Sequence, residues 1–236
     1  MRLNKFIASC GVCSRRDADK LIASGRVTVN YVTAQNGINV ENTDKVFLDG
    51  KELKPAEKTI VLAYYKPVGV TCTERDVHAE RTVIQELNYK KRVTYAGRLD
   101  KDSEGLLLLS NDGDLINAMM KGANLHEKEY EVVVDKDITD DFIYRMTNGV
   151  FLSEIGVRTR QCKVSKRGSR SFNIVLTQGL NRQIRRMCSE LGYEVVGLKR
   201  IRIMDLKLEK LKLSCGEYIE LDDALVDKLK KQCRLI

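Results

Sequence analysis

Short β-like runs dominate the chain beyond residue 60, and they constrain the fold more than any other feature of the sequence. Their apolar and β-branched residues are typical of strands, and brief helical patterns come between them. Because strands dominate and helices are few, the pattern favours an α+β fold with a mixed or antiparallel sheet. The predicted strands lie at 60–64, 93–96, 106–110, 130–134, 158–164 and 171–176, and the predicted helices at 82–87, 113–120, 139–148 and 183–191.

A different pattern covers the first 60 residues, which we expect to form a separate module. An apolar face predicts a short helix that ends at Gly11, and Ser14 is a suitable N-cap for a second helix that stops at Gly25. Two β runs follow at 27–29 and 45–48. A charged stretch with a proline then predicts a linker at 54–58, so the expected domains are 1–60 and 61–236.

The charge of the chain indicates a polyanionic partner. Its 236 residues carry a formal net charge of +8 with a pI of about 9.1, which favours nucleic acid. No apolar run is long enough to span a bilayer and the N-terminus has no hydrophobic region of a signal peptide, so we expect no membrane partner. The 7 scattered cysteines suit free thiols in the reducing cytoplasm.

One pair of cysteines, Cys10 and Cys13, has the CxxC spacing of many metal sites. A zinc site of this kind requires a second such pair or a pair of histidines, and the chain holds only His78 and His126. We therefore expect no metal and interpret the thiols as small apolar side chains that pack inside the protein.

Four basic residues, Arg15, Arg16, Lys20 and Arg26, gather on and after the second predicted helix, beside a small apolar core. They form either an ordinary solvated face or a surface that contacts RNA phosphates without recognising the bases. The surrounding sequence resembles the S4 RNA-binding domain, and this resemblance implies two helices packed on a small sheet. The segments that carry it are residues 2–8, 13–19 and 25–30.

A charged segment between two apolar runs is the strongest candidate for chemistry. The first run ends at Gly97, Arg98 and Asp100 follow at once, and Asp102 and Glu104 precede the second run. Charged residues on a loop that rigid elements hold are a common place for catalytic groups. Taken alone, the segment is better explained as a solvated turn between two strands.

A second basic cluster follows the predicted strand at 171–176. Gly179 permits a tight turn, and Asn181 is a suitable cap for a helix that starts near Arg182. Arg182, Arg185 and Arg186 are three and four residues apart and are predicted to share one side of that helix. The N-terminus of a helix with arginines is a good anion site, although a solvated basic face is the simpler explanation.

Two further segments carry polar groups on predicted strands. At 199–203 charged and apolar residues alternate, which predicts a strand with one buried face and with Arg200 and Arg202 exposed to phosphate. Tyr130 begins a strand in a charged setting, where a tyrosine either packs at an edge or stacks on an extruded base.

Taken together, these segments closely resemble the RsuA/RluB/RluE/RluF family of RNA pseudouridine synthases with an N-terminal S4 domain. The resemblance extends over almost the whole chain and is most like the RluF branch, which acts on 23S ribosomal RNA. It implies a catalytic domain with a mixed, mostly antiparallel sheet and flanking helices. The residues that carry it are 66–70, 97–115, 126–130 and 178–188.

The family resemblance implies that the protein isomerises uridine to pseudouridine without a metal, nucleotide or organic cofactor. By its place in the motif Asp100 is the catalytic aspartate, Arg185 is the basic residue of the active site and Tyr130 is the residue that stacks on uracil. A buried carboxylate needs a cation to stay ionised, so we predict an ion pair between Asp100 and Arg185. The RNA-binding residues that we expect are Arg15, Arg16, Lys20, Arg26, Gly97, Arg98, Leu99, Asn181, Arg182, Gln183, Arg186, Leu198, Arg200 and Arg202.

Two other functions stay open at this stage. One is a non-catalytic S4-type RNA-binding protein that assists ribosome assembly, and the other is a hydrolase of nucleosides or sugars that uses a carboxylate pair. For the synthase we expect ribosomal RNA as the partner, 23S first, with a tRNA as an open second substrate, and a monomeric protein. The sequence does not say whether Asp100 acts as nucleophile or as base.

Overall fold

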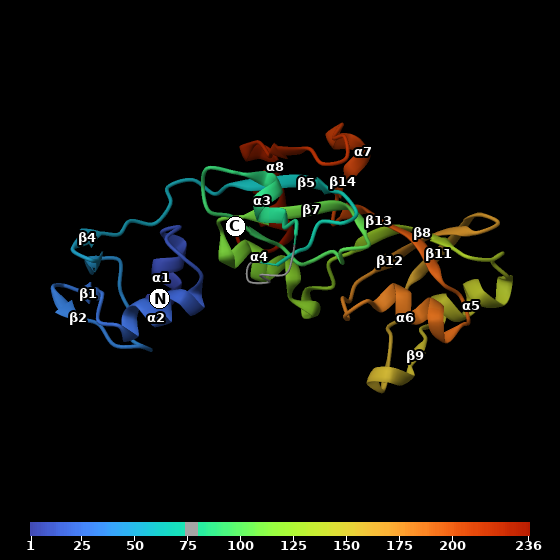
Figure 1. Cartoon of the computed structure of the whole chain (residues 1–236), viewed down its shortest axis with the longest axis horizontal. Coiled ribbons are helices and arrows are strands. Elements are labelled where there is room, and N and C mark those ends of the chain that lie inside the picture. The colour runs from blue at the N-terminus through green and yellow to red at the C-terminus, as the bar shows by residue number, and fades with distance from the viewer. Residues whose placement is uncertain (74–79) are drawn as a thin grey trace.

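The computed structural model describes residues 1–73 and 80–236, which form two units joined by an extended segment (Figure 1). His78, one of the two histidines in the metal argument, lies outside these residues. In the N-terminal unit two helices pack on a four-stranded antiparallel sheet of order β2-β1-β3-β4. Its elements are α1 (Leu3–Ser9), α2 (Arg15–Ala23), β1 (Val27–Val29), β2 (Val32–Thr33), β3 (Val46–Leu48) and β4 (Lys51–Glu52).

The predicted elements of this unit are confirmed. Ser14 is the N-cap of α2, and its hydroxyl accepts a hydrogen bond from the main-chain N–H of Asp17 at 3.2 Å. Leu3 and Ile7 of α1 and Ile22 of α2 are buried in one small core against the sheet. Such a cap satisfies one of the free N–H groups at the start of a helix and fixes where the helix begins.

The larger unit is built on one mixed sheet of order β11-β12-β8-β13-β7-β5-β15, with β14 paired to β13 and β6 to β7. Only β7 and β13 run parallel among the paired strands of the described residues, so the sheet is mostly antiparallel, as predicted. Its strands are β5 (Val61–Lys66), β6 (Thr94–Tyr95), β7 (Glu104–Ser110), β8 (Lys128–Val134), β11 (Lys163–Gly168), β12 (Ser171–Leu176), β13 (Val195–Ile203), β14 (Leu206–Lys207) and β15 (Tyr218–Glu220).

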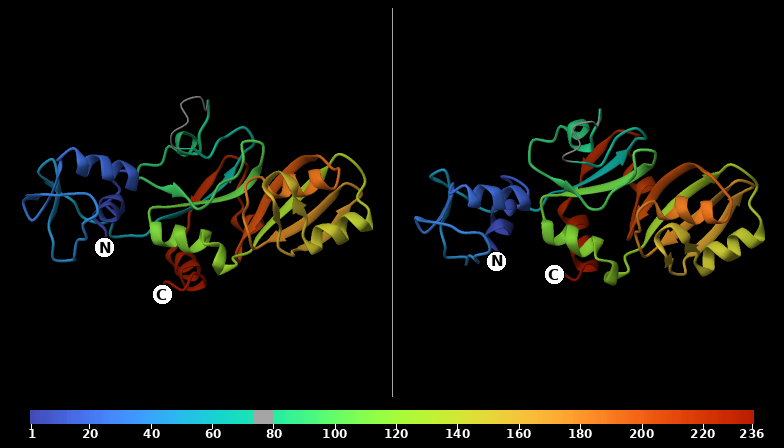
Figure 2. Two further views of the ribbon diagram at one scale, coloured as in Figure 1. Left: turned by 90° about the horizontal axis from the view of Figure 1, so that it is seen from below. Right: turned by 60° about the horizontal axis from the view of Figure 1, so that its bottom comes forward.

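Helices cover both faces of this sheet, and α4 and α8 lie on the side opposite α3 (Figure 2). Tyr130 packs against the cluster under α3 and also against the cluster under α5 and α6, so these two clusters are contiguous. No helix of residues 1–73 and 80–236 has the length and apolar character that a membrane span requires. The helices are α3 (Val83–Leu87), α4 (Gly113–Met120), α5 (Asp140–Asn148), α6 (Gln183–Glu190), α7 (Leu208–Leu211) and α8 (Asp223–Gln232).

The single strand predicted at 158–164 is wrong. The chain instead forms a short hairpin of β9 (Phe151–Leu152) and β10 (Val157–Arg158), then turns before β11 begins at Lys163. In the turn the N–H of Cys162 donates to the carbonyl of Thr147, at the end of α5. This contact with a distant part of the chain interrupts a run that locally has strand character.

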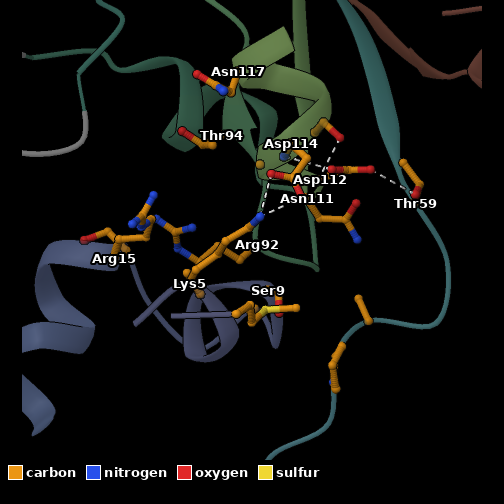
Figure 3. A pocket seen from close by; sticks show the side chains of 18 of the residues that line it. Lys5, Ser9, Arg15, Thr59, Arg92, Thr94, Asn111, Asp112, Asp114 and Asn117 are labelled. Carbon is orange, nitrogen blue, oxygen red and sulfur yellow. Dashed lines mark hydrogen bonds and ion pairs between the residues drawn. The ribbon is translucent and has the colours of Figure 1, made fainter. Parts of the chain in front are cut away.

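The two units meet at a groove of about 640 Å³ that residues of both line (Figure 3). The side chain of Lys5 crosses it and forms an ion pair with Asp114 at 2.7 Å, while Arg15 and Asn111 line its sides. Both partners of this pair are more than a third exposed, and exposed ion pairs contribute about 0–1 kcal/mol. The contact therefore orients the two units only weakly.

Candidate active site

The charged segment singled out in the sequence forms a loop between β6 and β7, and we call residues 97–103 the active-site loop. It starts at Gly97, whose φ is +80° and where a Cβ would lie 2.6 Å from the terminal carbon of Met120. Within the loop the N–H of Ser103 donates to the carbonyl of Asp100, and the N–H of Gly69 donates to the carbonyl of Lys101 at 2.7 Å. The loop is therefore held by main-chain contacts at several points and is a rigid support for its side chains.

Two arginines of the α6 region clamp this loop through Asp102. Nη2 of Arg182 lies 2.9 Å from one carboxylate oxygen, and Nη2 of Arg185 lies 3.2 Å from the other. Partial burial of Asp102 opposes its ionisation, but the hydrogen bond from Arg182 and the charges of both arginines outweigh it, so the pKa of this carboxyl lies below its usual value. Asp102 is thus an ionised anchor that shapes the loop.

The predicted ion pair between Asp100 and Arg185 is wrong. Arg185 donates to the carbonyl of Asp102 at 2.9 Å, to the hydroxyl of Ser103 at 3.3 Å and to the carbonyl of Val195 at 2.9 Å. Asp100 has a longer contact of 3.6 Å, with Arg182. The shorter contacts of both arginines go to Asp102 instead, and the Asp100 carboxylate is about one-third exposed.

Tyr130 lies on β8, half-buried at the boundary between the two apolar clusters of this face. The cluster under α3 also contains Leu99 of the active-site loop, so Tyr130 and the loop share one packed region. Leu198 is half-buried and packs on the neighbouring cluster, opposite Val132 in the register of β13 and β8. These positions are compatible with a pocket wall, but Leu99 is only 6% exposed and packs inside the cluster under α3 instead of facing RNA.

Two strand arginines that we expected on an RNA-facing surface are not available to phosphate. Arg200 is only 2% exposed. Arg202 forms ion pairs with Glu129 at 2.8 Å and with Glu127 at 3.0 Å. The prediction fails because β13 is an interior strand between β8 and β7, so its polar side chains are enclosed by neighbours.

The start of α6 also differs from the prediction. Arg182, not Asn181, is the N-cap residue, with φ of +50° and no side-chain cap. Gln183 is buried and its side-chain oxygen accepts from the N–H of Leu180 at 3.1 Å, so it organises the turn and does not face RNA. Arg186 forms an ion pair with Glu154 and does not join the two arginines at Asp102. Asn181 itself stays exposed.

The basic residues of the N-terminal unit lie on its surface, as predicted. Arg15, Arg16, Lys20 and Arg26 are exposed. Lys20 has a neighbouring carboxylate at 3.3 Å, and Arg26 pairs with Asp49. On the larger unit Arg98 is exposed beside Asp100, whereas Gly97 is half-buried.

One important residue of the site, Lys66, was not predicted from the sequence. Lys66 is fully buried at the end of β5, and its ammonium group donates to the carbonyls of Pro67 at 2.8 Å and Ser103 at 2.7 Å. A lysine that directly follows a buried apolar run was the signal available in the sequence. The thiol pair Cys10 and Cys13 is half-buried and free, and no cluster of three His, Cys, Asp or Glu residues in 1–73 and 80–236 is suited to a metal ion.

Comparison with known proteins decides which fold family this site belongs to. The family model described as RNA pseudouridylate synthase matches residues 60–190, and the S4 domain model matches residues 1–46. The chain belongs to the RNA pseudouridylate synthase family. Members of this family are isomerases, so the active-site loop and α6 form the candidate centre of an RNA pseudouridine synthase.

Similar proteins cover both units of this pseudouridine synthase. The dual-specificity RNA pseudouridine synthase RluF of Escherichia coli K12 is 46% identical over 98% of this chain and 79% of the relative. The ribosomal large subunit pseudouridine synthase B of Vibrio cholerae is 36% identical over 99% of this chain and 75% of the relative. A crystal structure of a pseudouridylate synthase superimposes with a TM-score of 0.72 at 28% identity, over 97% of this chain and 99% of that one.

Proposed function

We propose that this pseudouridine synthase isomerises a uridine of 23S ribosomal RNA and that Asp100 is its catalytic carboxylate. The observation that carries the proposal is the contrast within one loop. Asp102 is clamped by Arg182 and Arg185, whereas Asp100 has a single ion-pair contact, at 3.6 Å, within the described residues and stays partly exposed. A rigid loop that presents one accessible carboxylate suits a reaction at a single sugar carbon.

The reaction cuts the bond between N1 of uracil and C1′ of ribose, turns the base and joins C5 to C1′. We propose that Asp100 acts at the sugar, as nucleophile on C1′ or as base. The uridine has to leave the base stack because its C1′ is inaccessible in a helix. Tyr130 then stacks on the extruded uracil, and the exposed Arg98 occupies the space that the base leaves or holds its phosphate. Arg185 completes the catalytic set by fixing the loop through Asp102 and Ser103.

The names of two similar proteins support the proposed substrate. One is named for the ribosomal large subunit and the other for dual specificity. We therefore propose 23S RNA as the first substrate and a tRNA as the second, with a monomeric enzyme in the cytoplasm. The domain division at 1–60 and 61–236 is part of this proposal. The first domain would hold RNA phosphates through its exposed cluster Arg15, Arg16, Lys20 and Arg26.

Release of tritium from C5-labelled uridine in 23S RNA transcripts tests the proposal. The full-length protein should release tritium, and Asp100→Asn should release none above background while binding RNA as well as the parent. Asp140→Asn removes another carboxylate, on α5 and away from the loop, and should keep the wild-type rate. Activity in Asp100→Asn would refute the assigned role, and absence of activity in the parent on 23S RNA and tRNA would refute the proposed substrates.

A further inference from the structure

Four residues on neighbouring strands form one row across the centre of the sheet. In the register Lys66 of β5 lies opposite Gly105 of β7, Gly105 lies opposite Arg200 of β13, and Arg200 lies opposite Tyr130 of β8. Residues that are directly opposite in a sheet point to the same face. The row therefore places Arg200 beside Tyr130 and Lys66 two strands further along, on the face that carries the active-site loop.

Both cations of this row are buried. Lys66 is 0% and Arg200 2% exposed, and no carboxylate of the described residues lies within ion-pair distance of either one. Gly105, which has no side chain, lies between them in the row. A Cβ at Gly105 would lie only 2.3 Å from the carbonyl oxygen of Arg200, so the two strands approach each other too closely for any other residue.

The guanidinium of Arg200 contacts the main chain of both β7 and the active-site loop. Its Nε donates to the carbonyl of Leu106 at 2.7 Å, and its Nη1 donates to the carbonyl of Arg98 at 3.5 Å. Its Nη2 is buried and has no hydrogen-bond partner among the described residues. Lys66 holds the other end of the same loop through the carbonyl of Ser103. Together the two cations fix the main chain on both sides of Asp100.

A buried cation is costly unless nearby charge or hydrogen bonds compensate it. Here the compensation comes from main-chain carbonyls and, at longer range, from the carboxylates of the loop. Burial lowers the pKa of Lys66, and the charges of Cys72, Asp102 and Asp100 oppose that effect.

We propose that Arg200 is a positioning residue of the pseudouridine synthase, which holds the main chain at Arg98 so that the carboxylate of Asp100 stays in its reactive place. The inference rests on the proposed role of Asp100. Contact with RNA phosphate does not explain Arg200, because its guanidinium is enclosed. A displacement of about 1 Å at a reacting group costs about 100-fold in rate, so the loss of a support two residues from Asp100 is expected to reduce the rate strongly.

The test compares Arg200→Met and Arg200→Lys with the parent in single-turnover tritium release, with enzyme in excess over RNA and at a temperature well below unfolding. Arg200→Met keeps the apolar stem and removes every donor, so the rate constant should fall about 100-fold while the enzyme concentration at half-maximal rate changes less than twofold. Arg200→Lys keeps the charge and reaches one carbonyl, so its rate should lie between those of Met and the parent. Arg158→Met is the matched control, because Arg158 donates to the carbonyl of Gly149, outside the loop, and its rate should equal that of the parent.

Equal rates in the parent and both variants would overturn the proposal, and so would a loss that appears entirely as weaker RNA binding. If Arg200→Met does not fold, Arg200→Lys provides the test. A lysine variant with the parent's rate would contradict the proposal, because a lysine cannot hold the carbonyls of both Leu106 and Arg98. The parent and Asp100→Asn are measured in the same series. An inactive parent, or an Asp100→Asn variant as active as the parent, would refute the proposed function itself, independently of Arg200.

Discussion

Gly105→Ala is the substitution whose cost the structure defines most closely. The new methyl group would meet three main-chain atoms of Arg200, with the carbonyl oxygen at 2.3 Å, and ordinary contact requires β7 and β13 to separate by about 1 Å. The φ of Gly105 is +114°, a conformation that costs a residue with a side chain about 1–3 kcal/mol. Strand separation adds an overpacking cost of about 1–3 kcal/mol, and neither neighbour is a flexible side chain that could move aside.

We therefore expect Gly105→Ala to lower the free energy of unfolding of the larger unit by about 3 kcal/mol. Urea denaturation followed by far-ultraviolet circular dichroism measures this as a shift of the midpoint at an unchanged slope. Because the strands that separate carry Arg200 and the start of β7, the rate of tritium release should also fall, by about 100-fold, in the fraction of protein that is folded.

Gly113→Ala is the control for this experiment. Gly113 begins α4, has nothing within 4 Å of the position of a Cβ and has no left-handed φ. Alanine there should raise stability by about 0.5–1 kcal/mol and leave activity unchanged. The same midpoint for Gly105→Ala and the parent would show that β7 and β13 do not depend on the close approach seen here, and the reasoning about the row would fail with it.

Three further substitutions test other parts of the molecule. Arg185→Gln removes the contacts to Asp102 and Ser103, so tritium release should fall about 100-fold, while Arg145→Gln on α5 should leave it unchanged; similar rates in both would contradict the clamp. The double variant Arg15→Gln, Arg16→Gln should make the log–log salt dependence of RNA binding shallower by about 1.5, and an identical slope would exclude these side chains from the interface. Burial, with the charge of Arg200, lowers the pKa of Lys128 from 10.5 to about 8, so the unfolded chain binds this proton more tightly than the folded protein does. Below pH 8 the burial of the charged ammonium group lowers the free energy of unfolding by its full amount, so Lys128→Met should be more stable than the parent. Between pH 8 and 10.5 this difference in the free energy of unfolding should shrink, and a constant difference across that window would refute the prediction.

Local signals in the sequence were sufficient for most helices and strands. Ser14 caps α2 as expected because its hydroxyl satisfies the adjacent turn, and β12 occupies 171–176 as its apolar run predicted. The single strand at 158–164 was wrong because a contact with the end of α5 interrupts it, and no local pattern reports such a contact. The cap at Asn181 was wrong because Arg182 takes that place in a left-handed conformation.

The candidate site divides in the same way. The motif positions brought Asp100, Tyr130 and Arg185 into one hypothesis. In the structure Arg185 of α6 contacts the loop that carries Asp100, and that loop packs in the same region as Tyr130. The spacing could not show which carboxylate Arg185 contacts, because Asp100 and Asp102 lie on the same loop and only its folded path distinguishes them. The alternation at 199–203 predicted an exposed Arg200, but alternation reports which residues share a face and not whether that face is covered.

The sequence by itself determined the two-part organisation of the chain, the α+β character of its larger unit and the motif that carries Asp100, since these depend on local periodicity, capping and residue order. The tertiary structure alone decided what each charge does. Strand pairing placed Lys66 and Arg200 in one buried row, and the packing of α6 on the loop assigned Arg182 and Arg185 to Asp102. The physical reason is that the role of a charge depends on its solvent exposure and on its nearest opposite charge, and residues far apart in the chain set both.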